Sequence, residues 1–350
     1  MINDDIKNQK AGDYSTNFQA QNITLVNQQV IPVEYISTIC EKIVENNMLK
    51  YTIDAEEKAI QRFNKFKNLY IGEVSKQKKE IIEELTEKFK EPSMQDAFFQ
   101  AQKGYTKYGN DEKAEKLVQL LIEKGKQEMG SLKDILIDDA IDKLSKMTIN
   151  QLNILSYLNA ITLSYPSDSL EHFHKNYINK SLQFYFSINQ ERLDGDIQYL
   201  MQLGCIRQFY IAQGSNKIIN HIKESYGGLF AAGFTKQEFE SLYGVESEGI
   251  IMHCLTDSKL WQVVALNHTE LNKMYLNMNA NQQQQDIINK FYERILPDER
   301  IREIILQLEP RMKVLLENNK IHNYNLMPLG TLIGIKNYET MFNEEINWEV

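Results

Sequence analysis

Apolar residues recur three or four positions apart along most of this chain, and that spacing predicts a mainly α protein. Residues 132–147 carry a broad apolar stripe, while residues 149–163, with Leu152, Leu155 and Leu158, are apolar on almost every side. A helix that is apolar all round has to be enclosed by other elements. We therefore expect these two segments to lie at the centre of the core.

Polar side chains at the expected helix starts support this reading. The residues expected to cap helices are Ser93, Asn110 or Asp111, Ser131 and Thr148. The last of these, with Gln151 three positions on, is typical of a capping box, in which two side chains satisfy backbone N–H groups reciprocally. Residues 93–163 are therefore predicted to be a dense run of helices.

A narrower stripe runs from about Asp54 to Lys90, and no strong helix breaker occurs before Pro92. Gln77 and Lys78 interrupt the stripe. Uninterrupted, such a helix would be ~55 Å long at 1.5 Å per residue. This pattern predicts that residues 31–91 form a long N-terminal helical arm or coiled-coil-like stalk.

The amino-terminal segment has a different period. Between Asp13 and Val26 the side chains alternate with a period of two, which is typical of a β-strand, and both faces are semi-polar. A lone strand leaves backbone groups unpaired, so we expect residues 1–30 to be a β oligomerisation segment that pairs with the same segment of another copy. The residues expected to make this contact are Asn17, Phe18, Gln19, Gln21, Ile23, Leu25 and Val26. An edge strand docked on the helical body is the alternative.

The remaining residues, 92–350, are predicted to form one α-helical domain. A polar, glutamine-rich run at 277–285 suggests a sub-boundary near 276–286. Residues 204–212 could form a short strand. Pro310 should kink or divide a helix over 298–319, because proline cannot donate the backbone hydrogen bond.

Composition narrows the class of protein. The 350 residues carry a net charge of −9, and this negative charge argues against a general nucleic-acid-binding protein. Three widely spaced cysteines suit a reducing compartment. The first residues lack a signal-peptide pattern, and no apolar run reaches the ~20 residues that span a bilayer. We expect a cytoplasmic protein without a membrane span.

The chain offers few residues that could carry chemistry. The pair His172 and His174 would face about 200° apart on a helix, which does not suit one metal ion. Asp194 and Asp196 beside Glu191 are better explained by a capped turn than by a cation site. No phosphate-binding, hydrolase or zinc-binding motif occurs. We expect no cofactor and assign no catalytic, cofactor-binding or metal-ligating residues.

One further pair, His253 and Cys254, could serve as a base and a thiol nucleophile. Adjacent residues do not establish the required pairing in space, and a buried structural cysteine is the more common arrangement. We therefore interpret both residues as structural.

Several segments resemble known families. The segments Asp13–Ala20, Phe89–Gln102, Glu115–Lys124 and Ala140–Leu155 are similar to an uncharacterised bacterial family that opens with a Gly-Asp, Ser-Thr-Asn, Gln-Ala strand segment and continues in helices. The helical part, with Leu326–Ile335, is also distantly similar to the abortive-infection alpha-type proteins of phage defence. Met327 replaces the threonine of their closing motif. The resemblance implies a role in bacterial conflict or stress and assigns no catalytic residues.

These observations favour a non-enzymatic, oligomeric helical scaffold or sensor that binds a protein partner and associates through its N-terminal strand and long helix. One alternative is an effector enzyme with a composite active site at a subunit interface. Another is a nucleic-acid-binding regulator with a winged-helix-like tail, which needs a basic face at Arg300, Arg302, Arg311, Lys313, Lys320 and Lys336. Intervening glutamates argue against that last reading.

Overall fold

The structure is a computed structural model that describes residues 32–45, 53–165, 167–209, 216–244, 247–317 and 320–346. It is mainly α, as the sequence predicts. The longer helices are α1 (Pro32–Glu45), α2 (Ile53–Ser75), α3 (Lys79–Lys88), α4 (Pro92–Tyr108), α5 (Asp111–Gly125), α6 (Leu132–Lys146), α7 (Ile149–Ala160), α9 (Asn179–Phe186), α10 (Leu193–Gln202), α11 (Lys217–Tyr226), α12 (Lys236–Tyr243), α13 (His268–Met278), α14 (Gln282–Tyr292), α15 (Asp298–Leu308) and α17 (Pro328–Phe342). The predicted N-terminal strand and its seven contact residues lie outside the described residues.

Short elements complete the described fold. Two two-stranded antiparallel sheets pair β1 (Ile206–Gln208) with β4 (Tyr324–Leu326) and β2 (Ile251–His253) with β3 (Trp261–Val263). The short helices are α8 (Leu170–Phe173), η2 (His174–Ile178, a π-helix), η3 (Gln190–Arg192), η4 (Gly227–Phe230), η5 (Pro310–Met312), α16 (Lys313–Leu316) and η6 (Lys320–Asn323). Pro310 divides the predicted 298–319 helix, which confirms that expectation.

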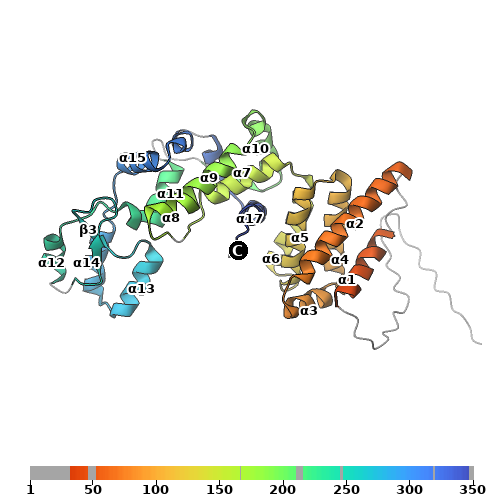
Figure 1. Cartoon of the computed structure of the whole chain (residues 1–350), viewed down its shortest axis with the longest axis horizontal. Coiled ribbons are helices and arrows are strands. Elements are labelled where there is room, and N and C mark those ends of the chain that lie inside the picture. Colours follow the sequence, from red (N-terminus) through yellow and green to blue (C-terminus); the bar gives the residue numbers. More distant parts are fainter. Residues whose placement is uncertain are drawn as a thin grey trace, which may run out of the picture.

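The molecule is elongated, with the N-terminal helices at one end and α12–α14 at the other (Figure 1). One hydrophobic cluster extends from Ile36 in α1 to Tyr338 in α17. A second, smaller cluster spans Phe234 to Tyr292. The stretch 276–286, where the sequence suggested a sub-boundary, covers the end of α13, the short connection after it and the start of α14, and both helices belong to this second cluster.

The segment 54–90 is not one continuous helix. It breaks after Ser75, at the Gln77 and Lys78 that interrupt the apolar stripe, and resumes at Lys79 as α3. Phe66 of α2 is fully buried and packs on Phe98 of α4 with ring centroids 5.8 Å apart. Residues 31–91 therefore differ from the predicted stalk, because the described helices of this stretch are part of the N-terminal bundle.

Helix α7 occupies the centre of the molecule, as its all-round apolar pattern predicts, and residues 151–160 are all buried. Its start is the predicted capping box: the Thr148 hydroxyl accepts the Gln151 N–H at 3.2 Å, and Gln151 Oε1 accepts the Thr148 N–H at 3.0 Å. Asn110 and Ser131 cap α5 and α6. Ser93 was wrong as a cap, because α4 begins one residue earlier at Pro92, which suits the first helical turn.

Candidate functional site

A cleft of about 390 Å³ opens where α7, β1, β4, α11 and α17 meet, and we name it the Lys217 cleft. Its apolar wall consists of Leu158, Leu163, Leu326, Ile335 and Ile346. Its polar lining consists of Asn159, Thr162, Arg207, Lys217, Asn325 and Thr331. The described residues that line this cleft include two cations and neither Asp nor Glu. The cleft has the size of a small-molecule site and the combination of apolar wall and few polar groups that such sites show.

Lys217 is the first residue of α11 and is held in a defined place. The Asn216 side chain caps α11 by accepting the Ile218 and Ile219 N–H groups. The same side chain donates to the Leu316 carbonyl at 2.9 Å. Lys217 Nζ donates to the Tyr324 carbonyl and to Asn325 Oδ1, each at 2.7 Å. The ammonium is thus fixed against β4 by neutral acceptors.

Burial sets the electrostatics of this lysine. An ammonium group has three N–H donors, and the two neutral acceptors use two of them. Lys217 has no carboxylate partner among the described residues, so only its two neutral acceptors offset part of the cost of removing its charge from water. Burial lowers the pKa of Lys217 to about 8. At neutral pH the cleft therefore holds a cation whose charge is only partly compensated.

Arg207 lies beside Lys217 through the short β1–β4 sheet. Its Cα partner across the sheet is Asn325, the residue that accepts from Lys217. Residues directly opposite each other on antiparallel strands project from the same face, so Arg207 and Asn325 share one face. The Arg207 side chain is exposed and makes no hydrogen bond or ion pair with another described residue, whereas its backbone pairs with Asn325 in the sheet. The sheet brings both cations to one end of the cleft.

A buried tyrosine–histidine pair lies close to Lys217. The Tyr157 hydroxyl is 2.6 Å from His322 Nε2, and the two rings stack with centroids 5.9 Å apart. Burial, and then the positive charge of Lys217, lower the pKa of His322 to about 4. The imidazole is therefore neutral at physiological pH and does not supply a third cation.

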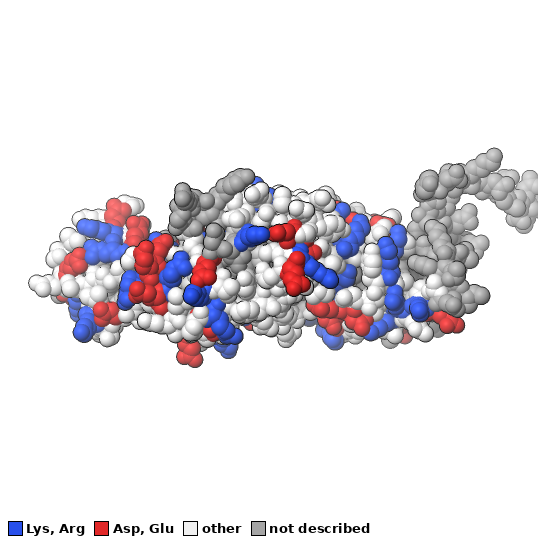
Figure 2. All heavy atoms as spheres, turned by 90° about the horizontal axis from the view of Figure 1, so that it is seen from above, with Lys and Arg blue, Asp and Glu red and all other residues white. Residues whose placement is uncertain are grey.

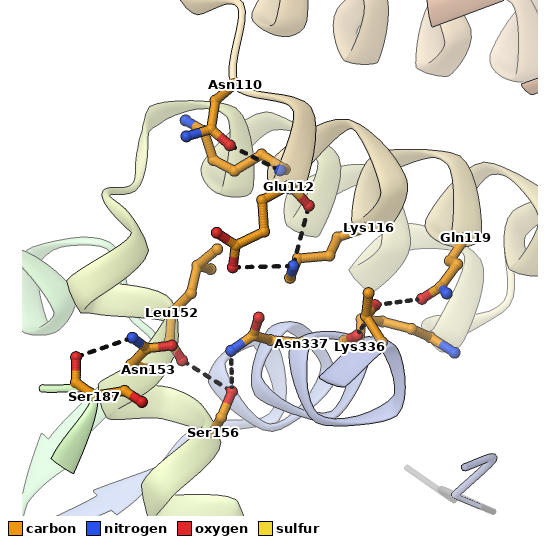
Figure 3. A network of polar contacts seen from close by, with 12 residues as sticks. Asn110, Glu112, Lys116, Gln119, Leu152, Asn153, Ser156, Ser187, Lys336 and Asn337 are labelled. Carbon is orange, nitrogen blue, oxygen red and sulfur yellow. Dashed lines mark hydrogen bonds and ion pairs between the residues drawn. The ribbon is translucent and has the colours of Figure 1, made fainter. Parts of the chain in front are cut away.

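The packing of α7 against α17 fixes the floor of the cleft. Ser156 Oγ donates to the Gly334 carbonyl at 3.0 Å and accepts from Asn337 Nδ2 at 2.7 Å, as Figure 3 shows in part. Asn159 Nδ2 bonds the carbonyls of Leu155 and Thr331 at 3.1 and 3.3 Å. These hydrogen bonds join α7 to α17, the two helices that contribute Leu158 and Ile335 to the apolar wall of the cleft.

A second surface feature lies on the N-terminal bundle. Leu132 and Ile135, 62 and 52 % exposed, lie three residues apart at the start of α6, and Met129, 58 % exposed, lies in the turn just before this helix; we call these three residues the α6 apolar face. Met129 also lines a hollow of about 770 Å³. The carboxylates of that hollow are Glu80, Glu83, Glu84, Glu87, Glu91 and Glu128, against Lys88, Lys90 and Lys126.

The structure does not bring His172 and His174 together as a metal site. His172 Nδ1 lies 2.6 Å from Asp168, whereas His174 Nε2 lies 3.8 Å from Glu309. No group of three His, Cys, Asp or Glu residues in the described part of the chain is placed to hold a metal ion.

Asp194 and Asp196 lie in the first turn of α10 rather than in the capped turn expected from the sequence, and they form structural contacts. Asp196 accepts Asn150 Nδ2 at 2.6 Å and Gln151 Nε2 at 2.7 Å, and it thereby ties the start of α10 to the start of α7. Asp194 pairs with Lys320 at 3.3 Å. The two carboxylates thus have separate partners.

His253 and Cys254 also contact different groups. His253 stacks on Trp261 with ring centroids 4.3 Å apart, and its Nδ1 lies 3.1 Å from the Ser258 carbonyl. Cys254 is buried, and its Sγ lies 3.2 Å from Thr256 Oγ1. Each of these two side chains therefore makes packing and hydrogen-bond contacts of its own, which agrees with a structural role.

The six basic residues that a nucleic-acid-binding tail would need have internal partners. Arg300, Arg311, Lys313, Lys320 and Lys336 form ion pairs with carboxylates, and Arg302 donates to the Leu316 carbonyl. On the face seen in Figure 2, basic and acidic side chains are interspersed. Phosphate binding needs clustered, uncompensated cations, so this arrangement disfavours the nucleic-acid reading.

Sequence reasoning missed the Lys217 cleft entirely. Its two cations come from β1 and α11, and Asn325 is 108 residues away from Lys217 along the chain. No local spacing signals such a site. The only hint was the short strand expected at 204–212, which places Arg207 in β1.

A protein-family model described as ":-like" matches residues 31–350 of the chain. No curated protein and no solved structure matches the chain. Among the described residues, no helix combines the length and the apolar character needed to cross a bilayer.

Proposed function

This chain belongs to the family matched over residues 31–350, and from that premise we propose that it is a non-enzymatic helical scaffold or sensor that binds a protein partner. We place it in the bacterial cytoplasm, in phage defence or a stress response. We further propose that copies associate through the N-terminal segment, residues 1–30, and through the long helical stretch that follows it in the sequence.

The observation that carries the partner-binding role is the α6 apolar face. Its three side chains are more than half exposed, whereas most large apolar side chains of the bundle are buried. Clustered exposed apolar residues bordered by charge are typical of protein interaction sites. The neighbouring hollow carries six carboxylates against three lysines, so a basic amphipathic helix is the partner that fits both chemistries.

A second candidate function is an effector enzyme with a composite active site at a subunit interface, and Lys217 is the observation that favours it. A lysine with a pKa lowered to about 8 by burial is partly neutral near physiological pH and can act as a base or nucleophile. Lys217→Arg keeps the charge and removes that chemistry. A measured activity abolished by Lys217→Arg in a folded protein would favour the enzyme over the scaffold.

The partner-binding proposal is tested with a double substitution, Leu132→Glu with Ile135→Glu, which places charge on the α6 apolar face. The control is Leu276→Glu on α13, where the side chain is 75 % exposed and far from α6. Cells that carry the wild-type or Leu276→Glu chain should resist phage infection in plaque assays, and cells with the double variant should not.

Circular dichroism should show equal helix content in all three proteins, because every altered side chain is on the surface. Full protection by the folded double variant would contradict the assigned surface. If the wild-type chain protects against no phage of a broad panel, the defence role is rejected.

A further inference from the structure

Lys217 and Arg207 form a compact cationic end to the Lys217 cleft. Both contribute to the lining, and Asn325 links them, as the cross-strand partner of Arg207 and the acceptor of a Lys217 hydrogen bond. None of the described lining residues is acidic. The field inside the cleft is therefore positive, although the whole chain has a net charge of −9.

The Lys217 ammonium has unused binding capacity. Its two acceptors are a backbone carbonyl and an amide oxygen, so its charge has no counterion among the described residues, and one N–H remains for another acceptor. A partly buried cation without a counterion has lost part of its hydration, and an anion brought beside it would recover part of that cost.

Apolar side chains line much of the remainder of the cleft, together with the neutral polar residues Asn159, Thr162 and Thr331. Leu158 and Leu163 come from α7 and the turn after it, while Ile335 comes from α17. At about 390 Å³ the space exceeds what a bare inorganic anion fills. A ligand that satisfies both ends has one charged head group and a short hydrocarbon part.

We propose that the Lys217 cleft binds a small amphipathic anion, with its carboxylate or phosphate head group beside Arg207 and Lys217 and its hydrocarbon part against the Leu158, Leu163 and Ile335 wall. This site is separate from the α6 apolar face. The proposal does not depend on a protein partner or on a defence role, because ligand binding is measured on the isolated full chain.

Titration calorimetry with octanoate and octyl phosphate tests the proposal and distinguishes the two head groups. Octyl glucoside, which has the same tail and no charge, and inorganic phosphate, which has no tail, are the reference probes. At least one amphipathic anion should bind about ten- to a hundredfold more tightly than either reference, because a hydrogen bond to an ionised head group is among the stronger polar contacts. Equal affinity for octyl glucoside or for inorganic phosphate would overturn the proposal, as would the absence of saturable binding by both anions.

Arg207→Gln is the safest variant, because this side chain is exposed and its removal leaves no buried group unpaired. It should weaken anion binding about tenfold, and Lys217→Gln should weaken it at least as much. Lys320→Gln, which removes an exposed lysine that pairs with Asp194, should leave binding unchanged. Wild-type affinity in the folded Arg207→Gln protein, or an equal loss in Lys320→Gln, would contradict the assigned site.

A chemical readout locates the anion independently. At pH 8 about half of the Lys217 side chains are neutral and nucleophilic, so an amine-acylating reagent should modify this lysine. A bound anion stabilises the ammonium form and should slow that reaction, whereas the rate at Lys320 should not change. Peptide mass spectrometry with and without the tighter of the two anions measures both rates, and unprotected Lys217 at a saturating anion concentration would reject the proposal.

Discussion

At the scale of single residues, several polar groups inside this protein are held by neutral partners rather than by opposite charges. Lys217 is fixed by a carbonyl and an amide, and Lys113 by the carbonyls of Ser145 and Met147 at 3.0 and 2.9 Å. His322 contacts the Tyr157 hydroxyl. Burial therefore acts on these groups mainly through desolvation, which lowers the pKa of Lys113, Lys217 and His322.

The His322 pKa predicts how stability depends on pH. The folded-state pKa is about 4, below the ordinary value of 6.5, so between these pH values the unfolded chain binds a proton that the folded chain does not. The contribution is complete above pH 6.5 and is lost as the pH falls towards 4. Because each pKa unit corresponds to ~1.4 kcal/mol, the free energy of unfolding should fall by roughly 3 kcal/mol over this window.

Urea unfolding at pH 7.5 and pH 5 measures this difference. His322→Gln should show a smaller loss between the two pH values than the wild type. Tyr157→Phe keeps the ring and removes only the hydroxyl, so it should retain the loss, because burial is the principal cause. An identical pH dependence in the wild type and His322→Gln would contradict the assignment.

At the scale of elements, the sequence predicted those features that are encoded locally. The Thr148 capping box is visible because its partner lies within a few residues. The interruption of the apolar stripe at Gln77 is also local, but the stretch was still expected to be one long arm, which the structure divides into α2 and α3. The central position of α17 was not predicted. Its partners on α7 are more than 170 residues away along the chain, so no local pattern shows which helix it packs against. The Lys217 cleft depends on the same distant pairings.

Gly334 tests the contact between α7 and α17. An added Cβ would lie 2.2 Å from Asn159 Nδ2 and 2.8 Å from the Leu155 carbonyl oxygen, so the two backbones would have to separate. Overpacking of this kind costs about 1–3 kcal/mol. Gly334→Ala should therefore lower the midpoint of urea unfolding.

The matched control is Gly195→Ala in α10, where nothing lies within 4 Å of the added methyl group. Alanine in a helix interior is favoured over glycine by ~0.5–1 kcal/mol, so this variant should be slightly more stable than the wild type. If both variants unfold at the wild-type urea concentration, the backbone approach at Gly334 is not close enough to matter.

At the scale of the whole molecule, two hydrophobic clusters lie along an elongated body, and the proposed surfaces are far apart on it. The α6 apolar face belongs to the N-terminal bundle, whereas the Lys217 cleft lies in the central part between that bundle and α12–α14 (Figure 1). The periodicity of apolar residues predicts the helical class but not this elongated shape. Periodicity is a local property, and the shape depends on how helices far apart in the chain pack.

Association of copies is a prediction at this scale. Residues 13–26 alternate with a strand period, and their semi-polar faces suit stacking of identical segments. Deleting residues 1–28 should lower the assembly mass in light scattering and leave the helical circular dichroism largely unchanged. The matched control replaces residues 13–26 with a scrambled sequence of the same composition, which should also lower the mass. An unchanged mass in the deleted protein would reject assembly through this segment.

The pairing of α7 with α17 also sets an order of events during synthesis. Gly334 leaves the ribosome 178 residues after Ser156, which at ~5–20 residues per second is a delay of roughly 10–35 s. During that interval α7, which is apolar on almost every side, lacks the helix that later covers one of its faces. The N-terminal bundle can close early, whereas the centre of the molecule cannot. The nascent chain therefore exposes the apolar side chains of α7 for many seconds. Its folding should depend on chaperones, although these side chains are buried in the folded protein.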